Sequence, residues 1–159
     1  MQPGVIRRGF ETTLEGIVIL LMVALAVEVT VGVAFRYAGR ALVWYDEVAS
    51  ILLAWVTYYG AALAALKRAH IGVPELVRLL RPALRVPIAI LAEAGVFAFF
   101  ILLGWVGYSV LEVLASDTLV SLPGVSVAWA QSVIPIGAAL FVIAEALTLP
   151  DTLREARRP

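Results

Sequence analysis

The chain contains no cysteine and a single histidine, His70, in 159 residues, and charged residues make up only 15% of it. The absence of cysteine excludes disulfides, thiolate metal sites and cysteine nucleophiles. One histidine cannot hold a haem in the two-histidine manner, and no residues show the spacing of a metal site. Twelve basic and twelve acidic residues give a formal net charge of zero, so we expect no affinity for nucleic acid. We therefore predict no catalytic residues, no cofactor and no metal.

Apolar residues are what the chain has in excess. They make up 62% of the sequence, and the mean hydropathy is +0.98, whereas a soluble domain is about half apolar. Four long runs carry the excess, and each is long enough to cross a hydrocarbon layer about 30 Å thick as a helix. We predict an all-α integral membrane protein, a single four-helix domain over residues 1–159. The spans are expected at about 14–35, 43–66, 86–114 and 127–149.

The first run resembles a signal peptide in one respect, because Arg7 and Arg8 precede it. Its apolar sequence continues to Phe35, however, far beyond the small residues at 24–26 where cleavage would fall. We expect this run to be retained as the first span.

Arginine and lysine are distributed unevenly between the two sides of such a protein. Placing both termini and the middle connector on one side puts ten of the twelve basic residues there and two, Arg36 and Arg40, on the other. Because short loops rich in Lys and Arg stay in the cytoplasm, we expect both termini to be cytoplasmic.

The middle connector predicts one further helix. Pro74 suits a helix start, and apolar residues then recur at helical spacing opposite a basic face. We predict a short amphipathic helix at about 74–85 in the cytoplasmic interface, with a solvated loop as the alternative. Its lipid-anchoring residues are Arg78, Arg81 and Arg85. The residues expected at the cytoplasmic edge of the second span are Lys67, Arg68 and His70, the last in a solvated or capping role.

Charged side chains inside the apolar runs need a reason, because a carboxylate at the bilayer centre costs about 2.5–3.5 kcal/mol. Glu28 is the deepest, about 12 Å along the helix axis from Arg36. Arg36 ends the first span and Glu47 begins the second on the same side, so we predict an arginine–carboxylate pair there. Asp46 and Glu28 are expected to join this structural charge network. The alternative, that these acids simply reach water at the headgroups, stays open.

The second run has a face of small and polar residues at helical spacing. Small residues let helices approach closely in lipid, where packing replaces the hydrophobic driving force. The members of this small-residue face are Ser50, Ala54, Thr57, Ala61 and Ala64, with the charged Glu47 and Arg68 at its two ends. The face predicts a helix–helix contact, and whether the contact lies within the chain or with a partner stays open.

An ordered set of short motifs gives the chain a family resemblance. The set comprises Phe35-Arg36-Tyr37, Trp44-Tyr45-Asp46-Glu47, Trp55, Gly60-Ala61-Ala62, His70-Ile71-Gly72-Val73, and Leu122-Pro123-Gly124-Val125 with Trp129. No single motif is specific, but their order closely resembles the small membrane subunit of TRAP (tripartite ATP-independent periplasmic) transporters over roughly residues 10–149. The sequence departs from the family at Asp46, where many relatives have glutamate, and at the entry to the fourth span, where the usual turn is altered.

The resemblance implies a role and a set of partners. Such a subunit pairs with a large polytopic membrane subunit that carries the substrate and sodium sites, and a periplasmic binding protein delivers the substrate, typically a carboxylate-bearing small molecule. The small subunit is implied to be a scaffold in a bacterial or archaeal inner membrane, and to offer part of the docking surface without binding substrate. Residues implied at the subunit interface are Trp44, Ser50, Ala54, Thr57, Gly60, Ala61, Ala64 and Trp129.

The competing interpretation is a self-sufficient transporter. Small proton-coupled exporters are also four-helix proteins with a membrane glutamate in the first helix, which invites comparison with Glu28. In this chain, however, acids occur in all four apolar runs, and we expect an interfacial helix that those exporters lack.

Overall fold

The computed structural model of the chain describes residues 5–68 and 82–156. Its helices are α1 (Val5–Tyr37), α2 (Tyr45–Leu66), α4 (Pro82–Leu114), α5 (Val127–Gln131) and α6 (Val133–Ala156). Four helical segments are long and apolar enough to cross a membrane: Arg7–Tyr37, Tyr45–Leu66, Leu84–Leu114 and Val127–Arg154. The prediction of an all-α protein with four membrane helices is therefore confirmed.

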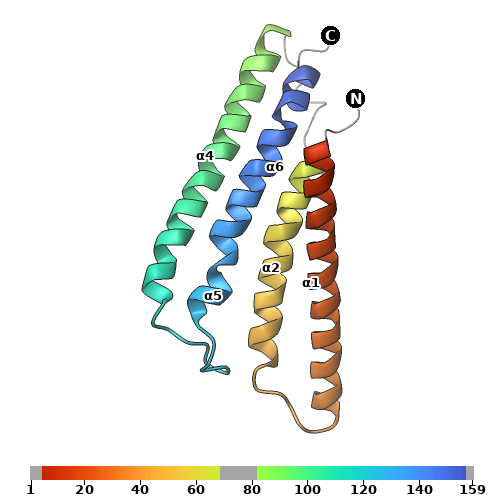
Figure 1. The fold of residues 1–159 in the computed structure, drawn as a ribbon, viewed down its shortest axis with the longest axis vertical. Coiled ribbons are helices and arrows are strands. Elements are labelled where there is room, and N and C mark those ends of the chain that lie inside the picture. Colours follow the sequence, from red (N-terminus) through yellow and green to blue (C-terminus); the bar gives the residue numbers. More distant parts are fainter. Residues whose placement is uncertain (1–4, 69–81, 157–159) are drawn as a thin grey trace.

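The helices have two distinct ends (Figure 1). At one end lie the start of α1 and the end of α6, which we call the terminal end. At the other lie connector 38–44 between α1 and α2, and connector 115–126 between α4 and α5, which together form the connector end. The predicted interfacial helix at 74–85 lies mostly outside the described residues, and the structure places residues 82–85 at the start of α4.

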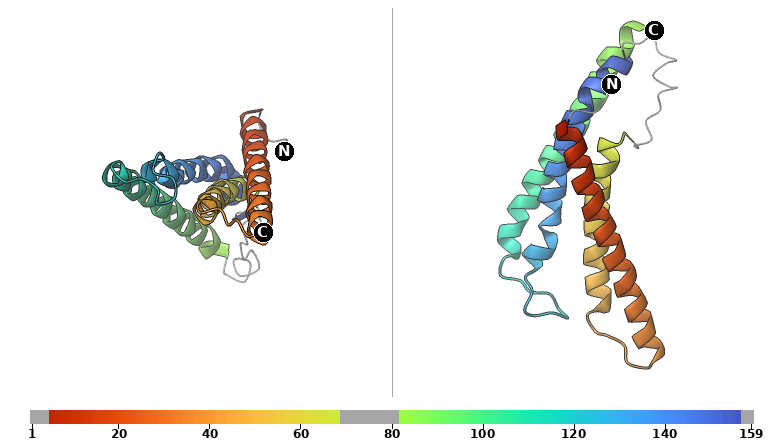
Figure 2. Two further views of the ribbon diagram at one scale, coloured as in Figure 1. Left: turned by 90° about the horizontal axis from the view of Figure 1, so that it is seen from below. Right: turned by 45° about the vertical axis from the view of Figure 1, so that its right-hand side comes forward.

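The helices pack as an open row rather than as a closed bundle. α1 packs on α2, α2 packs on α6, and α6 packs on α4, so α1 and α4 form the two edges of the row (Figures 1 and 2). The outer surfaces of the edge helices are apolar and exposed, with Leu20 of α1 at 68% and Trp105 of α4 at 75%. In lipid such surfaces are stable without a protein partner, because the tails of the lipid are apolar as well.

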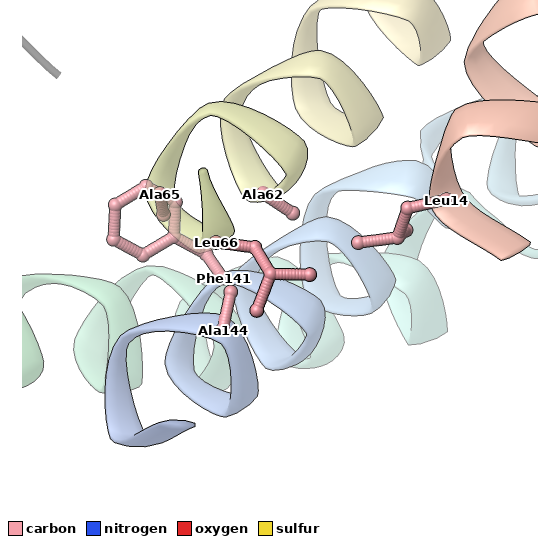
Figure 3. Close-up of a cluster of buried hydrophobic side chains, with 6 residues drawn as sticks. All are labelled: Leu14, Ala62, Ala65, Leu66, Phe141 and Ala144. Atoms are coloured by element: carbon pink, nitrogen blue, oxygen red, sulfur yellow. The ribbon is translucent and has the colours of Figure 1, made fainter. Parts of the chain in front are cut away.

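The most buried cluster lies where α1, α2 and α6 meet near the terminal end (Figure 3). Its members are Leu14, Ala62, Ala65, Leu66, Phe141 and Ala144. The Phe141 ring also stacks on Phe100 of α4, with ring centroids 3.6 Å apart, so the cluster reaches every long helix. The alanines of α2 allow this close approach because their side chains are so short.

Glycines mark two further points of close contact between helices. A Cβ added to Gly137 of α6 would lie 2.7 Å from the Cβ of Tyr58 in α2. A Cβ added to Gly107 of α4 would lie 2.7 Å from the Cγ2 of Ile134 in α6. The contact of α6 with α2 and its contact with α4 therefore each depend on a glycine, which has no side chain.

The fourth span is broken near its start, which the sequence prediction of one helix at 127–149 did not include. Ser126 caps α5 by accepting a hydrogen bond from the Ala128 N–H at 3.2 Å. The Ser132 N–H then bonds the Trp129 carbonyl at 3.3 Å, and α6 begins at the next residue. Pro135 explains the interruption, because it has no N–H to donate to the carbonyl four residues earlier.

Candidate functional site

Glu47 ties the start of α2 to connector 115–126. Its Oε1 accepts a hydrogen bond from the Val120 N–H at 3.1 Å, and its Oε2 accepts one from the Ser121 N–H at 2.8 Å. The Ser121 hydroxyl donates a third bond to Oε2. A carboxylate that accepts several hydrogen bonds makes stronger bonds than a neutral acceptor does. This carboxylate therefore fixes a connector more than seventy residues away in the sequence.

Connector 115–126 is itself an ordered turn. The Leu119 N–H bonds the Val125 carbonyl at 2.9 Å, and the Val127 N–H bonds the Asp117 carbonyl at 3.0 Å. The Leu119 side chain turns inward and is 7% exposed, while that of Val120 is 93% exposed. The connector thus has one buried anchor next to one apolar side chain in full contact with the surroundings.

The structure gives Glu47 a different partner from the predicted one. Arg36 is exposed at the end of α1, and within the described residues no ion pair joins it to Glu28, Asp46 or Glu47. Asp46 is exposed as well. The physical reason is that the backbone N–H groups of a turn satisfy a carboxylate as well as a guanidinium does. They also avoid the conformational entropy that is lost when a long arginine side chain is ordered.

Glu28 lies apart from this tie, half-buried on α1. Both of its carboxylate oxygens are buried and have no hydrogen-bond partner among the described residues. It interacts electrostatically with Asp46, a like charge when both are ionised. The predicted network of Arg36, Asp46, Glu47 and Glu28 is therefore not assembled in this structure, and its one firm member is Glu47.

Arg7 ties together three helices at the terminal end. Its Nη1 donates a hydrogen bond to Asp151 Oδ2 of α6 at 2.9 Å, and its Nη2 donates one to the Leu66 carbonyl of α2, also at 2.9 Å. The Leu66 carbonyl is among those at the end of α2 that have no partner within the helix. The planar guanidinium serves the two acceptors from two different nitrogens held in a fixed geometry, whereas a lysine ammonium would have to reach both from one nitrogen.

Lys67 makes a second tie at the same end. Its ammonium pairs with the Glu15 carboxylate of α1 and lies 4.0 Å from Glu11. The hydrogen bond to Glu15 raises the pKa of Lys67 above its ordinary value. Of the other residues predicted near this edge, Arg68 follows with a left-handed φ of 54° and Arg85 lies in the first turn of α4. His70, Arg78 and Arg81 lie outside the described residues.

Sequence reasoning missed Arg7 and Asp151 as site residues. In the sequence, Arg7 indicates topology and resembles the basic start of a signal peptide, and Asp151 lies beyond the predicted end of the fourth span. A basic residue before the first span and an acidic one after the last were the available signal, since both fall on the same side of the membrane in a protein with an even number of spans.

The small-residue face of α2 is only partly used by the chain itself. Residues Ala62, Ala65 and Leu66 are the buried ones, whereas Ser50 and Thr57 of the predicted face are exposed. The two hydroxyls bond backbone carbonyls of their own helix at 2.8 Å. Ala54, Ala61 and Ala64 of this face are half-buried, as is the nearby Gly60. The internal contact of α2 is thus made by neighbouring positions, and part of the predicted face is left uncovered.

Aromatic residues hold the break between α5 and α6. Trp55 of α2 donates its indole N–H to the Ala130 carbonyl at 3.1 Å. Its ring lies 5.3 Å from that of Trp129, which is 58% exposed, and 6.1 Å from that of Tyr59. Trp44, which the family resemblance also places at the subunit interface, is the half-buried residue that precedes α2. The indole therefore satisfies a carbonyl that the broken helix leaves free.

A pair of acids lies between α4 and α6. Glu93 of α4 interacts electrostatically with Glu145 of α6 and with Arg68. Among the residues the structure describes, no group of three or more His, Asp or Glu side chains is arranged to hold a metal ion.

Comparison with known proteins agrees with the motif resemblance. The family model "Tripartite ATP-independent periplasmic transporters, DctQ component" matches residues 14–155 of the chain. No curated protein matches the chain. The matched range includes all of α2, α4 and α5, nearly all of α6 and most of α1.

Proposed function

Because the chain belongs to the DctQ family, the small membrane components of tripartite ATP-independent periplasmic transporters, we propose that it is the fixed scaffold of such a transporter. On this proposal a large polytopic subunit carries the substrate and the sodium ions, and a periplasmic binding protein delivers a carboxylate-bearing small molecule. The small subunit binds neither substrate nor ion. The terminal end, which is rich in arginine and lysine, faces the cytoplasm, and the connector end faces the periplasm.

The open row of helices is the observation that carries this proposal. A helix bundle that binds a ligand builds its site from side chains on facing helices around a common core. Here α1 and α4 lie at opposite edges, and each of the two inner helices keeps faces that the chain does not cover. Such an arrangement offers broad surfaces for a membrane partner instead of an interior for a substrate.

The polar ties at both ends support a static role. Arg7 joins α1 to α2 and α6 at the terminal end, and Glu47 joins α2 to connector 115–126 at the other. Helices that are tied at both ends and packed against glycine between them resist sliding along one another. A transport subunit that moves its substrate across the membrane needs a partner with this property.

The uncovered part of the small-residue face is the surface we assign to the large subunit. Ser50 and Thr57 of this face are exposed on α2. Such residues suit a close helix–helix contact in lipid, because their short side chains let the backbones approach.

The experiment that tests this function combines purification with transport. The chain, co-expressed with the large subunit, should purify as a stable complex and support uptake in liposomes only when binding protein and a sodium gradient are both supplied. Replacing Thr57 by Leu should weaken the complex, whereas Leu91→Ile on the exposed face of α4 should not. Substrate-dependent transport by the small chain alone would refute the scaffold.

A second candidate function rests on Glu28. Its two buried, unpartnered oxygens are what a proton-coupled exporter would need at a site that exchanges a proton for a cation. That function predicts proton flux driven by a cationic substrate in liposomes containing the chain alone, and its loss in Glu28→Gln. The scaffold predicts no such flux in either protein, so one measurement separates the two.

A further inference from the structure

Two helices of the row end in the same left-handed turn, one with a glycine and the other with an arginine. α1 ends at Tyr37, and Gly39 follows two residues later with a φ of 72°. α2 ends at Leu66, and Arg68 follows two residues later with a φ of 54°. The N–H group of each bonds a carbonyl three residues earlier, at 3.1 Å for Gly39 and 3.0 Å for Arg68. The backbone geometry is thus shared, and only the residue type differs.

Arginine is the unfavourable choice at such a position. Glycine enters the left-handed region without a steric penalty, whereas in other L-residues the Cβ comes too close to the following carbonyl oxygen. Glycine is accordingly the usual residue just after a helix end. Among the non-glycine residues that the structure describes, Arg68 alone has a positive φ. Its side chain is therefore expected to make a contact that glycine cannot make.

The packing of the helices places the end of α2 beside α6 and α4. Leu66, the last residue of α2, lies in the buried cluster together with Phe141 of α6 (Figure 3). The Phe141 ring in turn stacks on Phe100 of α4. Because α4 and α6 run in opposite directions (Figure 1), the residues before Phe100 lie level with the residues after Phe141.

Two acids of α4 and α6 lie near this level. Glu93 comes about two turns before Phe100 in α4, and Glu145 comes about one turn after Phe141 in α6. Glu93 interacts electrostatically with Glu145 and with Arg68. The Oε2 atom of Glu93 is buried and has no hydrogen-bond partner among the described residues. A carboxylate that is cut off from water in this way is stabilised by a nearby cation.

We propose that Arg68 is an electrostatic latch, which holds the end of α2 to the acids Glu93 of α4 and Glu145 of α6 and so closes the open row at the terminal end. In the row α6 lies between α2 and α4. The latch therefore links two helices that are not neighbours, and it fixes the distance between the α1–α2 and α4–α6 pairs. The left-handed backbone of Arg68 is retained because it positions the guanidinium for this contact.

The test compares Arg68→Gly in two backgrounds of the full chain, by thermal unfolding in lipid nanodiscs. In the native background the substitution should lower the melting temperature, because the lost interaction with the acids outweighs the relief of the backbone. In the background Glu93→Gln with Glu145→Gln that interaction is absent. The same substitution should then raise the melting temperature by about 2–4 °C. A change of the same sign in both backgrounds, as expected for an exposed arginine that serves only to end the helix, would overturn the latch.

Gly39→Ala measures the backbone effect alone. Its φ is 72°, and a Cβ added there meets nothing within 4 Å. The substitution should lower the melting temperature by about as much as Arg68→Gly raises it in the background without the two acids. Unchanged melting of Gly39→Ala would overturn the premise that this turn disfavours a side chain, and the latch with it.

Pulsed electron paramagnetic resonance gives a second readout that does not depend on unfolding. Because the chain has no cysteine, nitroxide labels can be attached through Thr13→Cys on α1 and Leu91→Cys on α4, both exposed in the half of the row nearest the terminal end. Arg68→Gln, which removes the charge without introducing glycine, should broaden the distribution of distances between the labels and lengthen its mean. Arg8→Gln removes an exposed arginine of the same end and should change neither. Unchanged distances in Arg68→Gln would overturn the latch.

Discussion

Replacing Gly137 by alanine tests the central contact of the row. An alanine Cβ at this position would lie 2.7, 2.8 and 3.0 Å from the Cβ, Cδ1 and Cγ of Tyr58. Real Cβ atoms do not approach other atoms so closely, and the Tyr58 Cβ is attached to the backbone of α2, so a rotamer change cannot remove the clash. Helices α2 and α6 must move apart, and overpacking of this kind costs about 1–3 kcal/mol.

The matched control is Gly95→Ala on α4. A Cβ added there meets nothing within 4 Å. Both substitutions gain about 1 kcal/mol from the higher helix propensity of alanine, so this term cancels when the two variants are compared. We therefore expect Gly137→Ala to be less stable than Gly95→Ala by about 1–3 kcal/mol, the steric cost alone.

Thermal unfolding in detergent micelles, followed by tryptophan fluorescence, measures this difference. The Tyr58→Ala background provides a further check, because removing the ring leaves only the Cβ contact and should recover part of the loss. Equal stability of the two glycine variants would refute the close approach of α2 and α6 at this level, and with it the open row as described.

Three further predictions concern the polar and aromatic contacts. Arg7→Gln should lower the free energy of unfolding by about 1–2 kcal/mol, because two partly buried hydrogen bonds are lost, whereas Arg8→Gln should have no effect on the same melting curve. The hydrogen bond to Glu15 raises the pKa of Lys67, so the stability from this pair is present at neutral pH and is lost as the pH rises through the raised value; the difference in melting temperature between the native chain and Glu15→Gln should therefore be full at neutral pH and begin to shrink only once the pH exceeds the ordinary lysine value of 10.5. Trp55→Phe should cost about 1–2 kcal/mol by leaving a carbonyl of the broken helix without its donor, and Trp105→Phe on the exposed face of α4 should cost nothing measurable in the same assay.

The spans could be predicted from the sequence because length and hydropathy dominate the signal for a membrane helix. The ends of the helices could not. α1 begins at Val5 rather than near residue 14, since its first turns carry polar residues such as Arg7 and Glu15 whose partners lie on other helices. Hydropathy has no term for such contacts. The break before α6 had a local signal in Pro135, but a proline in an apolar run is equally compatible with a kink.

The candidate site shows a similar division. Glu47 was recognised from the sequence as a structural acid, because a carboxylate in an apolar run must be compensated. Its partner was predicted wrongly, because Arg36 ends the neighbouring span on the same side of the membrane whereas the true donors are two backbone N–H groups at 120 and 121. Every residue has such a group, so only the fold reveals which ones are available.

The contacts that hold the helices of the row together are separated from the surface that we assign to the large subunit. In lipid no hydrophobic force pulls helices together, so contacts between them depend on close packing and on polar links. The chain places its packing in the inner helices, at Gly137 and the buried alanines of α2, and its polar links at the two ends, at Arg7 and Glu47. Neither device uses the outer faces of α1 and α4. Neither device uses the exposed Ser50 and Thr57 of α2, so the large subunit of our proposal can contact that face without disturbing what holds the row together, as the proposed scaffold role requires.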